Sequence, residues 1–449
     1  MSLPPAFVEQ MNQQLGVDAE AFFESLERPS PVSIRLHPQK KIKWGENFEG
    51  VKWNTKGVYL AQRPVFTLDP LFQAGAYYVQ EASSMFVEEA FRQCFPDTHP
   101  LVALDLCAAP GGKSTLLASA LPAGSLLLSN EVIRNRHQVL QYNLTKWGLS
   151  HTHSSQQDSK DFQALAGFFD LVLVDAPCSG EGLFRKDPKA QGEWSPDHVQ
   201  HCAARQKRIL SEAIDLVKPG GFLFYCTCTY NEFENQANAE WLEQEFAVEY
   251  VPLHYPQDWH LVARDRGVQF YPHRVAGEGF YLACFRKLGE AQKIKGKGTK
   301  KSGLTPLPRK QRDQLTPWLK DLTPFSFGLD YHGNVRAWLK DQQDAISQLS
   351  TALRRFQVGF EVGIFKGKDF IPSPELALHT ALNKGVQQIE VDRLTALRFL
   401  KKESIEIPHL PKGWTLVQHQ GLGLGWIKVL PNRINNYYPK NWRILMAIE

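Results

Sequence analysis

Leu101-Val-Ala-Leu-Asp-Leu-Cys107 runs directly into Ala108-Ala109-Pro110-Gly111-Gly112-Lys113, and this stretch decides the fold. The apolar run predicts a buried strand, and the glycine turn leads into a helix over residues 113–120. A strand, a glycine turn and a helix start direct backbone N–H groups and the positive end of the helix at an anionic or dinucleotide-like ligand. The loop 107–113 is therefore the first candidate binding site in the chain.

Two kinds of nucleotide-binding site are possible for this loop. A phosphate-binding loop requires G-x-x-x-x-G-K-[ST], but Cys107 occupies the place of its first glycine. An adenosyl-methionine site instead requires an acidic residue at the end of the next strand to hold the ribose hydroxyls, and Glu131 is in that place. Together, the loop and Glu131 favour the adenosyl-methionine site over the phosphate-binding loop and over a purely structural turn. Asp158, after a possible third strand, is placed to accept from an adenine amine; a solvated loop carboxylate is the alternative.

Short apolar runs alternate with helical stretches from residue 75 to residue 287. The apolar runs are 126–128, 171–174, 222–225 and 281–285, and the helical stretches are 80–92, 113–120, 134–147 and 198–217. Buried strands that alternate with helices predict βαβ units and a mostly parallel, Rossmann-like α/β sheet. Lys218-Pro-Gly-Gly221 predicts the end of the last of these helices before the next strand.

The 449 residues are enough for two or three domains, and changes in composition divide the chain into five parts. Residues 1–74 are typical of a small α/β cap, with a solvated extension as the alternative. Residues 75–287 hold the alternating pattern, and 288–312 read as a flexible basic linker. Residues 313–380 and 381–449 return to a folded composition.

The composition, with 43% hydrophobic and 22% charged residues, excludes a wholly disordered chain. The formal net charge of +4 is too small to identify a nucleic-acid partner by itself. Seven cysteines, an odd number without an extracellular spacing pattern, argue against a disulfide scaffold. Because we find neither a signal peptide nor an apolar run of about 20 residues, we expect a cytoplasmic protein that does not span a membrane.

Two cysteines follow neighbouring strands of the predicted sheet. Asp175-Ala-Pro-Cys178-Ser-Gly180 follows the strand 169–174, and Cys226-Thr-Cys228-Thr-Tyr230 ends the strand 222–225. In an open α/β sheet, reactive groups gather outside the carboxyl ends of the strands, so Cys178 and Cys228 face the side where the loop 107–113 lies. A carboxylate and two thiols at one sheet edge favour covalent catalysis by a thiolate.

Other interpretations of the cysteines stay open at this point. A free cysteine is often only a small buried hydrophobe, which we expect of Cys94, Cys202, Cys226 and Cys284. A zinc site of Cys226, Cys228, Cys202 and His201 is disfavoured because C-x-C lacks the C-x₂-C spacing of zinc knuckles, and we predict no metal. A redox pair of Cys178 and Cys228 is disfavoured because the chain has no C-x-x-C motif.

The ordered motifs closely resemble the RNA cytosine-C5 methyltransferases of the NOL1/NOP2/Sun family. They are Asp105-Leu-Cys-Ala-Ala-Pro-Gly-Gly-Lys113, Asp175-Ala-Pro-Cys-Ser-Gly180 and Thr227-Cys228-Thr229, supported by Gln80-Glu-Ala-Ser-Ser-Met85 and Arg185-Lys-Asp-Pro188. The layout of the chain is most similar to the bacterial 16S ribosomal RNA methyltransferase F type (YebU-like). The resemblance implies an RNA-contacting cap at 1–74, an adenosyl-methionine-dependent methyltransferase domain at 75–287, an RNA-binding α+β domain at 313–380 and a PUA-like RNA-binding domain at 381–449.

The resemblance also implies roles for the site residues. The loop from Cys107 to Lys113 contacts adenosyl-methionine, Glu131 binds its ribose and Asp158 its adenine. Asp175 lies close to the cofactor and to the target base. Cys228 is the nucleophile, and Cys178 is the second cysteine, which releases the product.

Elementary chemistry is consistent with these roles. C5 of cytosine is a poor nucleophile, but thiolate attack at C6 turns the ring into an enamine whose C5 attacks the methyl sulfonium. Asp175 is placed to hydrogen-bond N3 and stabilise the charge that develops there. Loss of the C5 proton then frees Cys228, aided by Cys178. The reaction requires the base to leave its stack, and we expect Arg185 and Lys186 to hold the flanking phosphates.

The expected partner is RNA, namely 16S ribosomal RNA or the 30S subunit, with the decoding-site helix 44 region as target and a monomeric enzyme. Basic residues interleaved with aromatics in the tail suit phosphate contact and base stacking, with a small β-domain of ordinary surface charge as the alternative. These residues are Lys428, Arg433, Asn436, Tyr437, Tyr438, Lys440 and Arg443. A transfer RNA substrate and a non-catalytic ribosome assembly factor are the alternative functions, and a P-loop ATPase is a more distant one.

Two positions depart from the family pattern. In Ser33-Ile-Arg35-Leu-His37, His37 stands where the family often has Asn, so an RNA contact there is not implied. Cys226 stands where the family often has Ser, which leaves an extra thiol beside the expected nucleophile.

Overall fold

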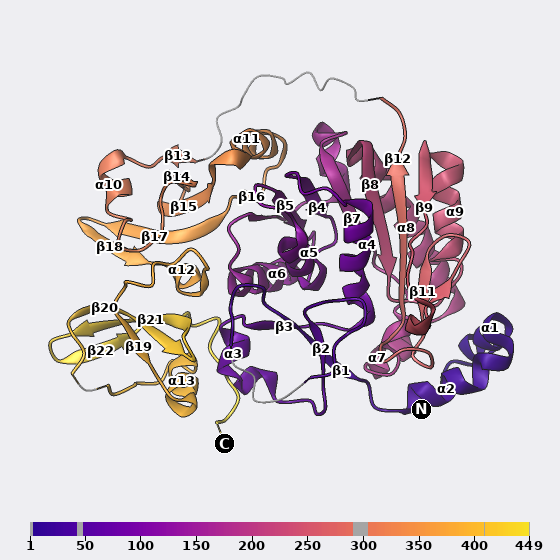
Figure 1. The fold of residues 1–449 in the computed structure, drawn as a ribbon, viewed down its shortest axis with the longest axis horizontal. Helices are drawn as coiled ribbons and strands as arrows, with labels where there is room; N and C mark the ends of the chain where they lie inside the picture. The colour runs from indigo at the N-terminus through magenta and orange to yellow at the C-terminus, as the bar shows by residue number, and fades with distance from the viewer. Residues whose placement is uncertain (1–2, 43–47, 291–303, 408, 449) are drawn as a thin grey trace.

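A computed structural model describes residues 3–42, 48–290, 304–407 and 409–448. Figure 1 shows a large central sheet, with the N-terminal helices at one side of the molecule and two smaller C-terminal sheets at the other. No helix in the described ranges is long and apolar enough to cross a membrane. Residues 291–303, which include Lys293, Lys295, Lys297, Lys300 and Lys301 of the predicted linker, lie outside the described residues.

The central sheet has the strand order β10-β11-β12-β8-β7-β4-β5-β6-β16, and β9 also pairs with β12. Its strands are β4 (Val102–Asp105), β5 (Leu126–Asn130), β6 (Thr152–Ser155), β7 (Phe169–Asp175), β8 (Val217–Thr227), β9 (Val248–Val251), β10 (Val262–Ala263), β11 (Val268–Phe270), β12 (Phe280–Lys287) and β16 (Phe356–Gln357). The pairs among β4, β5, β6, β7 and β8 are parallel. This order confirms the predicted Rossmann-like α/β sheet.

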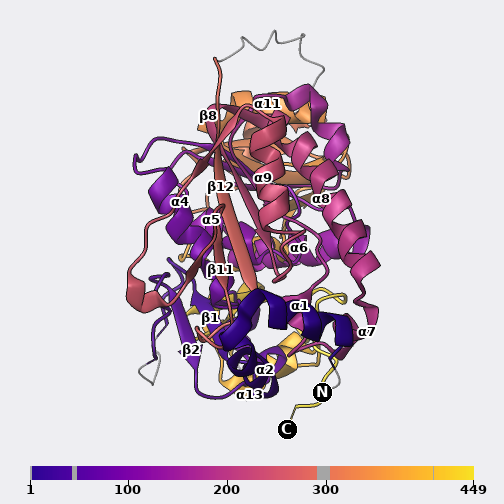
Figure 2. The same cartoon turned by 90° about the vertical axis from the view of Figure 1, so that its right-hand side faces the viewer.

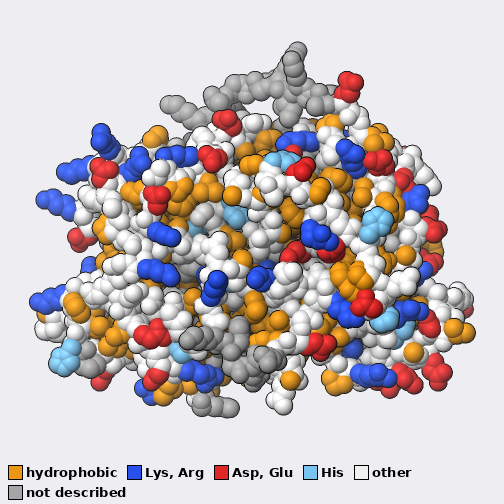
Figure 3. Space-filling view, in the orientation of Figure 1, with side chains coloured by type: hydrophobic (Ala, Val, Ile, Leu, Met, Phe, Trp, Pro, Cys, Tyr) orange, Lys and Arg blue, Asp and Glu red, His pale blue; other side chains and the backbone are white. Residues whose placement is uncertain are grey.

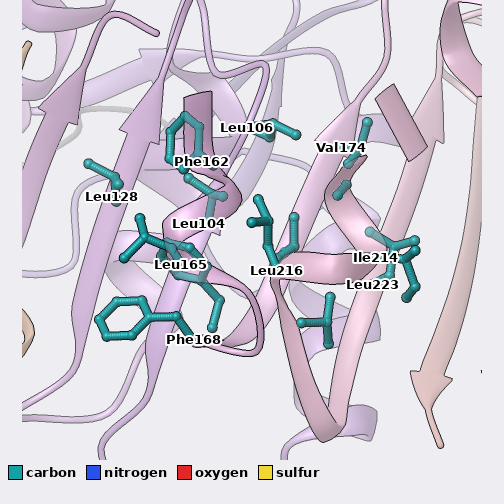
Figure 4. Packing of buried hydrophobic residues seen from close by; sticks show 14 of the residues in the cluster. Leu104, Leu106, Leu128, Phe162, Leu165, Phe168, Val174, Ile214, Leu216 and Leu223 are labelled. Atoms are coloured by element: carbon teal, nitrogen blue, oxygen red, sulfur yellow. The ribbon is translucent and has the colours of Figure 1, made fainter. Parts of the chain in front are cut away.

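The helices between these strands cover both faces of the sheet. They are α4 (Val87–Cys94), α5 (Gly112–Ala120), α6 (Arg134–Trp147), α7 (Pro188–Glu193), α8 (Pro196–Leu216) and α9 (Gln236–Glu245), with 3-10 turns η3 (Ser83–Phe86), η4 (Ser159–Leu165), η5 (Glu181–Leu183) and η6 (Gln257–Trp259). Figure 4 shows the core on one face, where Leu104, Leu128, Leu165 and Leu223 are packed with no more than 3% of their surface exposed. Because both faces are covered, strands such as β5 are buried at every position and read as continuous apolar runs.

Two predicted boundaries differ from the structure. The helical stretch 80–92 is a 3-10 turn followed by α4, which begins at Val87. Helix α8 ends at Leu216, one residue before its predicted end, and Lys218-Pro-Gly-Gly221 then lies in the first part of β8 rather than in a turn. A bulge accommodates these residues, because the register moves from Phe169↔Val217 to Leu171↔Phe222.

Residues 3–82 form an α/β unit that packs onto the central sheet. The helices are α1 (Pro5–Leu15), α2 (Ala19–Glu27) and α3 (Pro70–Gln73), the 3-10 turns are η1 (Gly16–Asp18) and η2 (Phe66–Leu68), and β1 (Val32–Leu36), β2 (Gly57–Leu60) and β3 (Tyr77–Val79) form a sheet in the order β2-β1-β3. Phe7 and Phe22 are fully buried and pack against Phe184 and Tyr230 in the segments that follow β7 and β8. Figure 2 shows α1 and α2 next to α7.

The C-terminal part holds two sheets. One contains β13 (Thr305–Pro306), β14 (Phe325–Leu329), β15 (Asn334–Leu339), β17 (Phe360–Lys366) and β18 (Asp369–Pro372), with α10 (Arg309–Asp313), η7 (Lys340–Gln342), α11 (Gln343–Ala352) and α12 (Pro374–Leu378); the other contains β19 (Gln388–Glu390), β20 (Gly413–His419), β21 (Leu422–Leu430) and β22 (Arg433–Asn436), with α13 (Arg393–Leu400). Leu416 and Trp426 of the second sheet share a core with Phe360 of the first. The short strand β16 lies between α11 and β17 and joins the central sheet beside β6.

Candidate active site

The structure brings Cys178 and Cys228 together. Strands β7 and β8 are parallel neighbours with Asp175 opposite Cys226, so their carboxyl ends deliver both thiols to one edge of the sheet. The two Sγ atoms are 3.2 Å apart and half-buried. The hydrogen bond to Cys228, together with burial, raises the pKa of the Cys178 thiol well above its ordinary value. Either sulfur can donate this hydrogen bond, so the two thiols form one hydrogen-bonded pair.

The close approach of the two cysteine loops depends on Gly182. Its backbone N–H donates to the Cys228 carbonyl oxygen at 2.8 Å. A Cβ at this position would lie only 2.7 Å from that oxygen and from the Gly279 carbonyl oxygen. Any side chain at residue 182 would therefore force the loops apart.

Asp175 and Lys113 form an ion pair beside the cysteines. The Lys113 Nζ is 2.8 Å from Asp175 Oδ2 and lies 5.2 Å from the centre of the Phe280 ring. Burial alone would lower the pKa of Lys113, but the surrounding charges, chiefly Asp175, raise it above its ordinary value. The lysine that ends the glycine loop is thus directed at the Asp-Ala-Pro-Cys motif, which joins the two predicted parts of the site.

The glycine loop itself passes close to other backbone. Gly111 has φ +112°, a conformation that favours glycine, and Ala108 N–H donates to the Asn130 carbonyl oxygen at 2.8 Å. Asp105 is fully buried at the start of the loop, and burial raises the pKa of its carboxyl to about 7. Its Oδ2 accepts from Ser114 at 2.6 Å, whereas Oδ1 has no partner. An unpartnered buried acceptor beside a glycine loop suits a polar ligand group.

The next two strand ends continue this site. Glu131 is 3% exposed, accepts from the Ile133 N–H at 2.9 Å and lies 3.5 Å from Arg136. Val132 and Ile133 are each about half exposed. A carboxylate followed by exposed aliphatic side chains matches a ligand that has ribose hydroxyls next to an apolar ring.

Asp158 lies at the far end of the same edge. Its carboxylate caps η4 by accepting from the Lys160 N–H at 3.3 Å, and it lies 3.6 Å from Arg208. A hollow of about 550 Å³ opens beside it. The hollow is lined by Val132, Gln156, Gln157, Asp158, Asp161, Ala352, Arg354 and Arg355.

Sequence reasoning missed Arg354 and Arg355. They reach this hollow because β16 pairs with β6, which also lets the Gln156 N–H donate to the Arg355 carbonyl oxygen at 3.1 Å. A two-residue strand that lies about 200 positions from its partner carries no periodicity in the sequence. Only the tertiary arrangement places the C-terminal region at this edge.

Sequence reasoning also missed the role of Arg35. The side chain is 1% exposed and donates to Gln80 Oε1 at 2.8 Å and to Thr115 Oγ1 at 2.6 Å, on the helix that follows the glycine loop. His37 is buried as well and contacts the Trp147 carbonyl oxygen at 2.8 Å. In this structure Arg35 braces α5 and His37 contacts the end of α6, and neither side chain is exposed for an RNA contact.

Replacement of Arg35 by alanine is expected to destabilise the protein. The change leaves Gln80 and Thr115 without their partner and removes a guanidinium that lies 4.6 Å above the Trp147 ring. Lost hydrogen bonds to a buried charged group lower the free energy of unfolding by about 2–4 kcal/mol. Urea denaturation measures this loss. Arg28→Ala is the matched control, because Arg28 is exposed directly after α2 and forms a surface ion pair with Glu24. Equal stability of the two variants would contradict the bracing role.

The prediction that Arg185 holds a phosphate is wrong. Its guanidinium is buried, pairs with Glu278 at 2.9 Å and donates to the Ser25 and Gly277 carbonyl oxygens. The side chain is therefore used to join α2 to the loop before β12. Lys186 is partly exposed and 3.3 Å from Glu278.

The C-terminal tail separates into structural and exposed residues. Tyr438 is 3% exposed, and Asn436 donates to the Phe399 carbonyl oxygen. By contrast, Lys428 lies 5.2 Å above the Trp414 ring, which meets Tyr437 edge-on at 4.5 Å. Arg433, Lys440 and Arg443 are exposed. Figure 3 shows one face of the molecule, on which Lys and Arg side chains lie along the side of the C-terminal sheets and across the middle.

The prediction that four cysteines lie in the core is confirmed. Cys94, Cys202, Cys226 and Cys284 are all buried. Among the described residues, no group of three or more His, Cys, Asp or Glu side chains is placed to hold a metal ion.

The parallel sheet, the glycine loop after β4 and the acidic residue at the end of β5 together define a Rossmann-like methyltransferase fold. Comparison with solved structures agrees. A structure described as a methyltransferase homolog from Pyrococcus horikoshii superposes with a TM-score of 0.54 at 28% identity, over 63% of this chain and 95% of that one. NSun6 from P. horikoshii, solved with SFG, has the same fold, with a TM-score of 0.54 at 19% identity over 64% of this chain and 99% of that one.

The chain belongs to the RsmB/F family of 16S rRNA methyltransferases. Residues 96–286 match the family described as 16S rRNA methyltransferase RsmB/F, 3–82 match the N-terminal domain of RsmF, and 386–444 match its PUA domain. Ribosomal RNA small subunit methyltransferase F of Salmonella schwarzengrund is 30% identical over 97% of this chain and 96% of the relative. The protein of the same name from Escherichia coli O139:H28 is 29% identical over the same shares.

Proposed function

We propose that this protein transfers a methyl group from S-adenosyl-L-methionine to C5 of cytosine in 16S ribosomal RNA through a covalent adduct of Cys228. The single observation that carries the proposal is the pair of thiols 3.2 Å apart at the carboxyl ends of β7 and β8, next to Asp175. The family match and the small-subunit ribosomal RNA methyltransferases that resemble the whole chain support the substrate class.

The residues at the sheet edge fit adenosyl-methionine. Asp105 and the loop 107–113 would hold its methionine part, Glu131 its ribose, and Val132 and Asp158 its adenine. When bound, the cofactor supplies an electrophilic methyl group. Arg354 and Arg355 line the adenine end, where a guanidinium stacks well on an aromatic ring.

Each residue of the thiol site has a task in this reaction. Cys228 attacks C6 of the cytosine, which makes C5 nucleophilic. The Cys178 sulfur, 3.2 Å from that of Cys228, would hydrogen-bond the attacking sulfur. The proton that Cys228 gives up ends on N3 of the base, and Asp175, held by Lys113, accepts a hydrogen bond from that N3–H. After methyl transfer, solvent water takes the C5 proton. The C6–S bond then breaks with Cys178 assisting, and Cys228 leaves as a thiol that regains the proton from N3.

RNA binding is assigned to exposed and partly exposed basic and aromatic side chains of the C-terminal region. Lys428, Trp414 and Tyr437 form a cation and ring cluster on the sheet that matches the PUA domain, and such clusters suit unpaired bases. The target base must be turned out of its stack to reach half-buried thiols.

We also propose the decoding-site helix 44 region of 16S rRNA as the target. We further propose that the enzyme is monomeric and cytoplasmic, and that the chain has five parts that meet at residues 74, 287, 312 and 380.

Methyl transfer to defined RNAs tests the proposal. The purified chain is incubated with methyl-labelled adenosyl-methionine and, separately, with unmodified 16S rRNA, 30S subunits from cells that lack the gene, and transfer RNA. Nucleoside analysis is expected to place the label in 5-methylcytidine from 16S rRNA or the 30S subunit. Label in transfer RNA alone would replace the substrate, and label in no RNA would favour a non-catalytic assembly factor.

Replacement of Glu131 by alanine is expected to weaken cofactor binding. The carboxylate would otherwise hold two ribose hydroxyls by charge-assisted hydrogen bonds, whose loss lowers affinity by about 10-fold or more. Isothermal titration with adenosyl-methionine measures this change without RNA. Glu20→Ala, an exposed residue of α2, is the control. An unchanged dissociation constant for Glu131→Ala would contradict the assignment.

A further inference from the structure

Two consecutive buried residues, Glu234 and Asn235, contact the backbone on either side of the two cysteines. They lie between β8 and α9, are 0% and 3% exposed, and are outside the sets of residues predicted from the motifs. Glu234 contacts the loop of Cys178, whereas Asn235 contacts the loop of Cys228.

Glu234 fixes the residues that flank Cys178. Its Oε2 accepts from the Ser179 N–H at 2.9 Å and from Gln206 Nε2 at 2.7 Å. Gln206 Nε2 also donates to the Pro177 carbonyl oxygen at 3.0 Å. One carboxylate and one amide thus hold the residue before Cys178 and the residue after it.

The orientation of Gln206 is itself fixed. Its Oε1 accepts from Tyr225 OH at 3.0 Å and from Asn238 Nδ2 at 2.8 Å, so its amide nitrogen is directed at Pro177 and Glu234. All of these side chains are buried, and the hydrogen bonds among them fix the orientation of Gln206 and Glu234 Oε2, whereas Glu234 Oε1 and Asn238 Oδ1 have no partner among the described residues. Burial raises the pKa of Glu234 to about 7, but the Ser179 N–H needs only an oxygen acceptor.

Asn235 fixes the residues that flank Cys228. Its Oδ1 accepts from Thr227 Oγ1 at 2.5 Å, and its Nδ2 donates to the Thr229 carbonyl oxygen at 3.0 Å. The same nitrogen donates to Gln269 Oε1 at 2.9 Å, which anchors the amide to β11. Thr227 and Thr229 are fully buried, and Asn235 is the side chain that contacts both of these neighbours of Cys228.

We propose that Glu234 and Asn235 are positioning residues with a division of tasks between two steps of the reaction. Glu234 orients Cys178 for product release, and Asn235 orients Cys228 for adduct formation. The proposal rests on the proposed function. The two loops are also joined directly by Ser179 Oγ to Thr229 Oγ1 at 3.0 Å and by Gly182 N to Cys228 O at 2.8 Å. Neither Glu234 nor Asn235 takes part in these links, which is why each side chain affects mainly its own cysteine.

Single-turnover and steady-state methylation of 30S subunits, with adduct measured on denaturing gels, test this division. Glu234→Ala is expected to keep single-turnover methylation within about 3-fold of the unsubstituted protein, to lower steady-state turnover by about 10-fold or more, and to accumulate adduct. Asn235→Ala is expected to lower the single-turnover rate by about 10-fold or more and to give no adduct. Glu232→Ala is the control, because Glu232 is an exposed carboxylate in the same segment.

Further variants keep the test decisive. Glu234→Gln retains an oxygen acceptor for the Ser179 N–H and is expected to recover most of the steady-state turnover. If Glu234→Ala does not fold in a thermal melt, Gln206→Ala, which removes the contact with Pro177, is expected to give the same release defect. Equal losses in both rates for the Glu234 and Asn235 variants, or no adduct with either Glu234→Ala or Gln206→Ala, would overturn the division. Absence of methylation by the unsubstituted protein would instead contradict the proposed function.

Discussion

Cys228→Ala is expected to abolish methyl transfer. Without the sulfur no bond to C6 forms, so C5 of cytosine stays too weak a nucleophile to take the methyl group. Removal of a covalent nucleophile from an enzyme costs at least about 10⁴-fold in turnover. Incorporation of labelled methyl groups into 16S rRNA or 30S subunits measures the loss.

The matched control is Cys226→Ala, two residues earlier and inside β8. Cys226 is fully buried, and its replacement removes one sulfur atom from the core at a cost of about 1 kcal/mol in stability. This variant is expected to keep methylating, and titration of both variants with adenosyl-methionine shows whether the cofactor site is intact. Methylation by Cys228→Ala at more than a small fraction of the rate of Cys226→Ala would end the covalent mechanism.

Cys178→Ala is expected to trap the enzyme on its RNA. Attack by Cys228 and methyl transfer proceed, but the C6–S bond no longer breaks efficiently because the second thiol, 3.2 Å away in the intact site, is missing. The adduct therefore rises from a trace to a large share of the enzyme. A denaturing gel of enzyme mixed with 30S subunits and adenosyl-methionine shows it as a band of reduced mobility.

The double variant Cys178→Ala/Cys228→Ala distinguishes this adduct from adventitious cross-linking. It lacks the attacking sulfur and is expected to give no shifted band. A gel on which Cys178→Ala also shows no shifted band, under conditions where the unsubstituted protein turns over, would contradict the release role of Cys178.

The sheet was predictable because its signals are local. Strands buried on both faces are continuous apolar runs, and helix α6 over 134–147 follows its predicted bounds. The start of β8 was not predictable, because Lys218-Pro-Gly-Gly221 carries turn residues that are also tolerated in a bulge. Turn residues mark the end of a helix but do not tell whether the next strand has already begun.

The candidate site was predictable only where a residue lies next to a strand end. That rule holds for the glycine loop, Glu131, Asp175 and both cysteines. Lys113 departs from it, because its long side chain turns toward Asp175. The motifs likewise did not predict the buried Arg35 or the C-terminal Arg354, because their contacts join segments far apart in the sequence.

Bisulfite sequencing of ribosomal and transfer RNA from cells with and without this gene tests the central claim most directly, since 5-methylcytosine resists conversion. The account predicts a cytosine in 16S rRNA, in the helix 44 region, that is protected only when the gene is present, and that loses protection when the gene carries Cys228→Ala. Identical conversion of every cytosine in 16S rRNA with and without the gene would contradict it.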